Sequence, residues 1–138
     1  VVAVALTVAG PVGVDVEAVA AVSAQPVERV ALSDRERRAI HRLPPDARPE
    51  ALAEAWVRKE AALKALGTGL RVDPRAIRLS GRLRGAARMS GGGASLTTAM
   101  LALGPGVAGA VALARAGRHR PSLQVELHDG DALLARLT

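Results

Sequence analysis

The sequence that decides the fold is Trp56-Val57-Arg58-Lys59-Glu60-Ala61-Ala62-Leu63-Lys64-Ala65-Leu66-Gly67. Residues with high helix propensity fill this stretch, and Gly67 can adopt the left-handed conformation that closes a helix. Pro49, which lies upstream, suits the first turn of a helix. We therefore predict a long helix from about Pro49 to Leu66.

One face of this helix is apolar at the 3.6-residue period, which predicts that it packs on a sheet. The residues that share this face are Leu52, Ala55, Trp56, Ala62, Leu63 and Leu66. Glu60 lies at the margin of the face, and Lys64 lies one turn further along. Taken alone, the two could be a surface ion pair worth only about 0.2 to 0.5 kcal/mol.

The distribution of lysine argues against a purely surface role. The chain has 17 arginines and two lysines, and both lysines, Lys59 and Lys64, lie in this helix. A lysine is a compact charge that can lose its proton, whereas arginine stays charged. Two lysines kept in one helix indicate a chemical task, although chance clustering of two residues is the alternative.

A second acidic segment, Gly13-Val14-Asp15-Val16-Glu17, lies near the start of the chain. Side chains alternate along a strand, so Asp15 and Glu17 should point to the same side. Together with Glu60 they give three carboxylates for one site. The chain has no cysteine, and its three histidines share no metal-ligand spacing, so a bound metal would be a hard cation such as magnesium.

The remaining patterns predict an α+β fold: an antiparallel sheet with one long helix and one or two short helices packed on it. Ser33 and Glu36 have the spacing of a capping box, and that helix should end before Pro44. Gly10-Pro11 should join two strands into a hairpin, and Gly91–Gly93 should form another hairpin turn. The predicted strands are Val1–Ala9, Val12–Val19, Ile77–Leu83, Ala94–Leu103, Val107–Ala114 and Leu123–Leu127.

Length and composition bound the classes of function. A chain of 138 residues suits a single domain spanning 1–138. The net charge of +6 favours an anionic partner, but Trp56 is the only aromatic residue, which argues against a nucleic-acid partner. Residues 1–14 are too short to cross a membrane and lack the basic start of a signal peptide. We expect a cytoplasmic protein with no membrane partner.

At this point the residues carry a family resemblance. Val12-Gly13-Val14-Asp15-Val16-Glu17 and Trp56-Val57-Arg58-Lys59-Glu60-Ala61-Ala62-Leu63-Lys64 resemble the two signature motifs of the 4'-phosphopantetheinyl transferases, G-[IV]-D-[IV]-E and W-x-x-K-E-A-x-x-K. Glu60 follows Asp15 by 45 positions, a separation similar to that of the surfactin-synthetase-activating type. Leu32-Ser33-Asp34-Arg35-Glu36 is similar to the segment that lies between the motifs in that family.

The resemblance implies magnesium-dependent transfer of the phosphopantetheine arm of coenzyme A to a serine of an apo acyl or peptidyl carrier protein. It implies Asp15, Glu17 and Glu60 as magnesium ligands. Glu60 would accept the serine proton, directly or through water, and Lys64 would neutralise or protonate the leaving phosphate. Lys59 would also contact phosphate. A basic surface would assist encounter with an acidic carrier protein.

The chain departs from the surfactin type because it resembles only the second half of that pseudo-dimer. We expect a chain of the larger type that lacks its first half; the alternative is a half-size chain that self-associates as a homo-oligomer, as in the small holo-acyl-carrier-protein synthases. The small synthases resemble this chain in length and in the Lys64–Gly69 stretch. The functional alternative is an inactive remnant that binds an acidic carrier protein, or another anionic partner, without catalysis.

Overall fold

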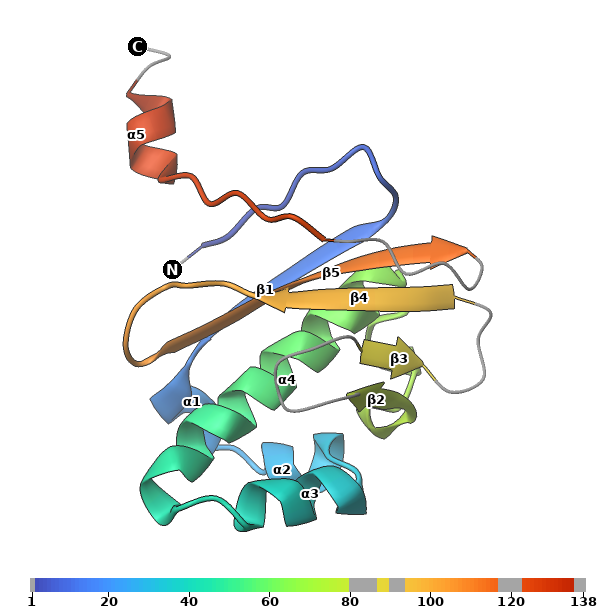
Figure 1. The fold of residues 1–138 in the computed structure, drawn as a ribbon, viewed down its shortest axis with the longest axis vertical. Helices are drawn as coiled ribbons and strands as arrows, with labels where there is room; N and C mark the ends of the chain where they lie inside the picture. Colours follow the sequence, from blue (N-terminus) through green and yellow to red (C-terminus); the bar gives the residue numbers. More distant parts are fainter. Residues whose placement is uncertain (1, 80–86, 90–93, 117–122, 136–138) are drawn as a thin grey trace.

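The computed structural model describes residues 2–79, 87–89, 94–116 and 123–135, and it has the predicted α+β architecture (Figure 1). Its five strands form an antiparallel sheet in the order β1-β5-β4-β3-β2. The strands are β1 (Val12–Ala18), β2 (Ile77–Leu79), β3 (Ala87–Met89), β4 (Ala94–Met100) and β5 (Val107–Ala116). The helices are α1 (Val19–Ser23), α2 (Val27–Ala31), α3 (Asp34–His41), α4 (Arg48–Ala65) and α5 (Gly130–Leu134), with 3-10 turns η1 (Pro45–Ala47), η2 (Gly69–Arg71) and η3 (Pro74–Ala76).

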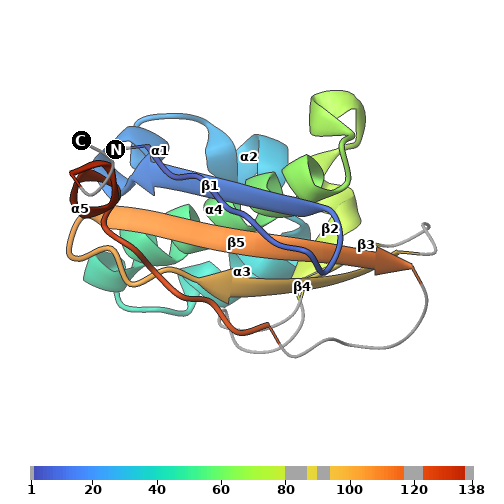
Figure 2. The same ribbon diagram turned by 90° about the horizontal axis from the view of Figure 1, so that it is seen from above.

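The long helix α4 lies across one face of the sheet, as the two ribbon views show (Figures 1 and 2). It has a proline in its first turn, as predicted. At its other end Gly67 has φ of 65°, the left-handed conformation that the sequence predicted. The capping box of α3 is also confirmed, because the Ser33 hydroxyl accepts from the Glu36 amide and the Glu36 carboxylate accepts from the Ser33 amide.

Alanine fills much of the layer between α4 and the sheet. One cluster of buried residues contains the alanines Ala53, Ala61, Ala62 and Ala65 of α4 and Ala108, Ala110, Ala112 and Ala114 of β5. Small side chains on both sides let a helix approach a sheet closely. The burial of α4 is wider than the single predicted face, since Val57 and Ala61, outside that face, are fully buried.

Helix α4 approaches the sheet closely at Gly13 in β1. A Cβ atom added there would lie 2.2 Å from the carbonyl oxygen of Ala61 and 2.5 Å from the amide nitrogen of Ala65. Only a residue without a side chain can occupy this position while the helix stays where it is. Gly13 therefore sets the distance between α4 and the acidic side chains of β1.

The predicted hairpin of Val1–Ala9 with Val12–Val19 is wrong. Residues 2–11 form no strand, whereas Val12–Ala18 forms β1 and pairs antiparallel with β5. The larger apolar side chains of the segment 2–8 are at least 80% exposed. A continuous apolar run rich in valine gave the strand pattern. Among the described residues, however, β1 lies at the end of the sheet and pairs only with β5, and residues 2–9 add no strand to its other edge.

The other secondary-structure predictions are confirmed in part. Ile77, residues 94–100 and residues 107–116 lie in strands, while residues 123–127 form none and are half-buried to exposed. Helices α1 and α2 were not predicted. Residues 80–83 of a predicted strand and the turn at Gly91–Gly93 lie outside the described residues. Within the described part of the chain, no helix has both the length and the apolar character needed to span a membrane.

Candidate functional site

β1 and α4 bring Asp15 and Lys64 into contact. The Lys64 ammonium donates to Asp15 Oδ1 at 2.7 Å and to the Val14 carbonyl oxygen at 3.1 Å. The Asp15 side chain is buried, at 8% exposure, while that of Lys64 is half exposed, at 49%. The observed ion pair of Lys64 therefore joins the helix to the strand, in contrast to the surface pair with Glu60 that helical spacing alone would give.

Glu17 and Glu60 complete a group of three carboxylates. Asp15 is paired with Ala110 and Glu17 with Ala108 in the register of β1 and β5, so both acids point to the α4 side of the sheet, as predicted. Burial raises the pKa of Glu60, and the negative charges of Asp15 and Glu17 raise it further, against the opposing effect of Lys64. Glu60 is thereby made a better proton acceptor.

Asp15 also carries the clearest sign of an incomplete site. Its Oδ2 atom is buried and has no hydrogen-bond partner among the residues that the structure describes, although a buried carboxylate oxygen normally has one. Oxygen donors and three negative charges suit a hard divalent cation in kind. Among the residues that the structure describes, however, no three His, Cys, Asp or Glu side chains are already arranged around one point to hold a metal.

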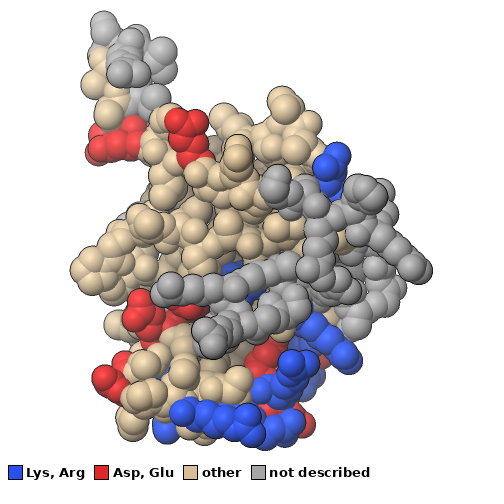
Figure 3. Space-filling model, viewed as in Figure 1, with Lys and Arg blue, Asp and Glu red and all other residues tan. Residues whose placement is uncertain are grey.

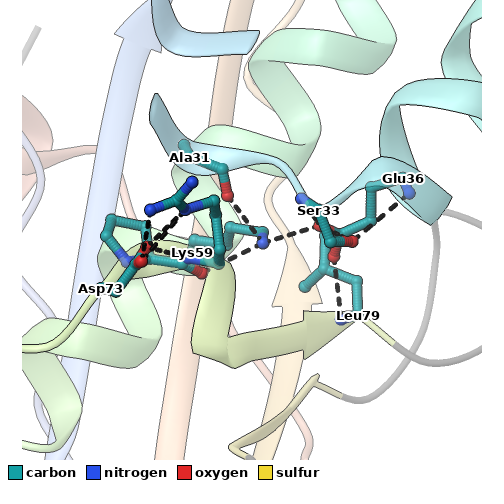
Figure 4. A network of polar contacts seen from close by, with 8 residues as sticks. Ala31, Ser33, Glu36, Lys59, Asp73 and Leu79 are labelled. Atoms are coloured by element: carbon teal, nitrogen blue, oxygen red, sulfur yellow. Dashed lines mark hydrogen bonds and ion pairs between the residues drawn. The ribbon is translucent and has the colours of Figure 1, made fainter. Parts of the chain in front are cut away.

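Lys59 lies apart from this group. Its side chain is fully buried, and its ammonium donates to the Ala31 carbonyl oxygen at 2.9 Å, to Glu36 Oε2 at 2.8 Å and to the Pro74 carbonyl oxygen at 3.1 Å (Figure 4). Burial opposes ionisation of Glu36, but hydrogen bonds from Lys59 and Ser33 outweigh it and lower the pKa of Glu36. Contact of Lys59 with a phosphate, which the family resemblance implies, would require this network to open.

Sequence reasoning did not anticipate the buried pair of Glu36 with Lys59. The capping-box pattern identified Glu36 only as a helix-start residue. Of the predicted turn or surface histidines, His41 contacts Glu28 with its Nε2 atom 2.5 Å from Oε1, and His128 is exposed near Glu126. His119 lies outside the described residues.

A basic surface lies at the end of the molecule formed by α3 and the turn that follows it. Basic side chains gather there in the space-filling view (Figure 3), and they belong to arginine, because Lys59 is buried and Lys64 is bonded to Asp15. The exposed arginines of this region are Arg35, Arg38 and Arg42. Beside it, a hollow of about 1050 Å³ lies between α3, the first half of α4 and β2, and it does not include the carboxylate group of Asp15, Glu17 and Glu60.

Comparison with known proteins shows which family and which solved structures this chain resembles. Residues 11–112 match the family model of the 4'-phosphopantetheinyl transferase superfamily. The apo-ACPS structure of Chronobacterium ammoiniagenes is 25% identical with a TM-score of 0.63, and the match covers 78% of this chain and 96% of that one. A Bacillus anthracis holo-(acyl-carrier-protein) synthase in complex with CoA (3',5'-ADP) is 20% identical with a TM-score of 0.66 and the same coverage. The Thermotoga maritima holo-[acyl-carrier-protein] synthase is 23% identical with a TM-score of 0.61, covering 78% of this chain and 64% of that one. No curated protein matches.

Proposed function

Because the chain belongs to the 4'-phosphopantetheinyl transferase superfamily, we propose that it transfers the phosphopantetheine arm of coenzyme A to a serine of an apo acyl or peptidyl carrier protein. The observation that carries the proposal is the juxtaposition of Asp15, Glu60 and Lys64 across the contact of β1 with α4. These are the residues of the two sequence motifs. We expect the reaction to take place in the cytoplasm.

In the proposed reaction, a bond forms between the serine oxygen of the carrier protein and the phosphorus that bears the pantetheine arm. The pyrophosphate bond to that phosphorus breaks, and adenosine 3',5'-bisphosphate leaves. Glu60 accepts the serine proton, directly or through water, which its raised pKa favours. The Lys64 ammonium, half exposed, neutralises or protonates the leaving phosphate.

Magnesium is the cation that we propose for the carboxylate group. Asp15, Glu17 and Glu60 would hold it, and the unpartnered Asp15 Oδ2 is the atom that supports this assignment. When bound, the ion would offset negative charge on the pyrophosphate oxygens. Lys64, already bonded to the other Asp15 oxygen, would place its positive charge beside the same phosphates.

The acidic carrier protein is the partner that the chain's charge favours. The net charge of +6 and the exposed arginines of α3 would steer an acidic surface toward the enzyme. The separation of Asp15 from Glu60 supports the surfactin type of the superfamily, with the site completed by a missing half or by a second copy of the chain. Binding without catalysis remains the competing function, and the same experiment decides between them.

The test is the mass of an apo acyl carrier protein after incubation with this chain, coenzyme A and magnesium. We expect a gain of one phosphopantetheine arm that is lost when magnesium is omitted. Glu60→Gln should abolish the gain, whereas Glu50→Gln, an exposed position at the start of the same helix, should preserve it. A folded chain that binds the carrier protein but never modifies it would refute the proposal and favour the inactive remnant.

A further inference from the structure

We infer that the buried pair of Lys59 and Glu36 is a positioning device, which fixes the rotation of α4 and so aims Glu60 at β1. The inference rests on the proposed function. It assigns to Lys59 a role different from the phosphate contact that the family resemblance implies. The evidence is the geometry of the network and the character of the surface on which α4 packs.

The Lys59 ammonium ties together three segments that are distant in sequence. Its three hydrogens are matched by three acceptors: the Ala31 carbonyl oxygen at the end of α2, Glu36 Oε2 in α3 and the Pro74 carbonyl oxygen in η3. An ammonium group has three donors. With all three used and the side chain at 0% exposure, Lys59 is an anchor from the helix to its surroundings.

Glu36 extends the anchor to the sheet. Its Oε2 atom accepts from the Ser33 amide and hydroxyl as well as from Lys59, and its Oε1 atom accepts from the Leu79 amide in β2 at 3.2 Å (Figure 4). The carboxylate therefore joins α3, α4 and the edge strand. A buried charge with this many partners is costly to disturb from one side.

The alanine layer explains why α4 needs such an anchor. Helices are normally held in rotation by the ridges and grooves that large side chains form. Here α4 and β5 meet largely through alanine, and Val57 and Leu63 are the larger buried side chains of the helix. Polar contacts therefore share the task of holding the helix in rotation, and the buried hydrogen bond from Arg58 Nε to Thr98 Oγ1 at 3.1 Å acts beside the Lys59 network. Lys59 and Glu60 are consecutive and lie about 100° apart around the helix axis. A rotation set by Lys59 is therefore transmitted directly to Glu60.

The experiment is a double-mutant cycle of Glu36→Gln and Lys59→Met in the full chain. Carrier-protein modification is measured as kcat and as KM for coenzyme A, well below each melting temperature. We expect kcat to fall at least tenfold in each variant, since displacement of a reacting group by about 1 Å can cost about 100-fold. KM should be unchanged, because neither side chain touches the substrate. The double variant should be no slower than the slower single one.

Ser33→Ala is the matched control. It removes a cap of α3 but leaves Lys59 bonded to Glu36, so it should lower the melting temperature without changing kcat. If Lys59→Met fails to fold, Glu36→Gln, which preserves shape and an acceptor, carries the test. Wild-type kcat in folded Glu36→Gln would overturn the inference. So would a raised KM in Lys59→Met alone, which would show direct phosphate contact.

A second readout separates this inference from the proposed function. If the wild-type chain transfers nothing, the proposed function fails, and amide hydrogen exchange in α4 decides the positioning role. Amides around Glu60 should exchange faster in Glu36→Gln and Lys59→Met than in Ser33→Ala. Equal protection in all three variants would overturn the inference without reference to activity.

Discussion

Replacement of Gly13 by alanine tests the contact that brings the two motifs together. The added Cβ would lie 2.2 Å from the Ala61 carbonyl oxygen, 2.5 Å from the Ala65 amide nitrogen and 2.7 Å from the Lys64 Cβ. Ordinary non-bonded contacts are about 3.5 to 4.0 Å. Two of the three obstacles are backbone atoms of α4, so relief requires the helix to move by about 1 Å.

The expected cost follows from this overlap. Overpacking of a core costs about 1 to 3 kcal/mol, and backbone obstacles place Gly13→Ala at the upper end, at about 3 kcal/mol. For a domain of this size, a loss of 1 kcal/mol lowers the melting temperature by about 4 °C, so we expect a decrease of about 12 °C. Transfer should fall further than stability, because the same movement separates Lys64 from Asp15.

The measurement is urea unfolding followed by circular dichroism, with melting curves beside it. Gly109→Ala is the matched control on the neighbouring strand β5. There the nearest atom is the end of the Leu103 side chain at 2.5 Å, which can rotate away, so a change within about 1 kcal/mol is expected. Alanine is otherwise favoured over glycine in a strand by about 0.5 to 1 kcal/mol. A more stable Gly13→Ala protein would refute the close approach.

Three further predictions follow from the charges and the exposure. Glu60→Gln should remove activity and yet stabilise the fold by about 0.5 kcal/mol at neutral pH, because the charged form of a partly exposed carboxyl beside Asp15 is disfavoured. Chemical unfolding of both proteins measures this difference, and a less stable variant would contradict the prediction. Glu36 has a lowered pKa when folded, so the stability that it contributes is present above the ordinary pKa of 4.5 and is lost as the pH falls through the folded pKa. The free energy of unfolding should therefore fall less steeply with acid in Glu36→Gln. An identical acid dependence in both proteins would count against the ion pair of Glu36 with Lys59. Leu6→Ser and Val8→Ser should leave the melting temperature unchanged, because these side chains are 93% and 108% exposed; a large decrease in a melting scan would show that the segment is packed.

The sequence predicted the local features of the fold better than its long-range pairings. The helix around Glu60, the capping box at Ser33 and the closing glycine Gly67 depend on neighbouring residues, and all are confirmed. The hairpin at Gly10 failed because an apolar run signals a strand without naming its partner: β1 pairs with the distant β5, and residues 2–9 pair with no described strand. β5 is an alanine-rich and valine-rich strand that pairs with both β1 and β4, and periodicity alone cannot reveal that choice.

In the candidate site, too, local features could be predicted from the sequence and long-range contacts could not. Alternation was enough to place Asp15 and Glu17 on one side of a strand, and the helical period placed Glu60 and Lys64 one turn apart. Neither pattern could show that Lys64 would bond to Asp15, because that contact depends on how closely α4 approaches β1. Nor could spacing distinguish a lysine that faces a substrate from Lys59, whose charge is met by residues from three other segments.

The alanine layer makes the protein unequally tolerant of mutation. Truncation of a side chain, the commonest way in which cores are weakened, has almost nothing to remove at Ala61 or Ala112. Enlargement is the damaging direction, because every added methylene must push α4 off the sheet. Substitutions of alanine by valine should therefore destabilise the protein more than substitutions of alanine by glycine in this layer. A deep mutational scan would locate the contact of α4 with β5 by that difference.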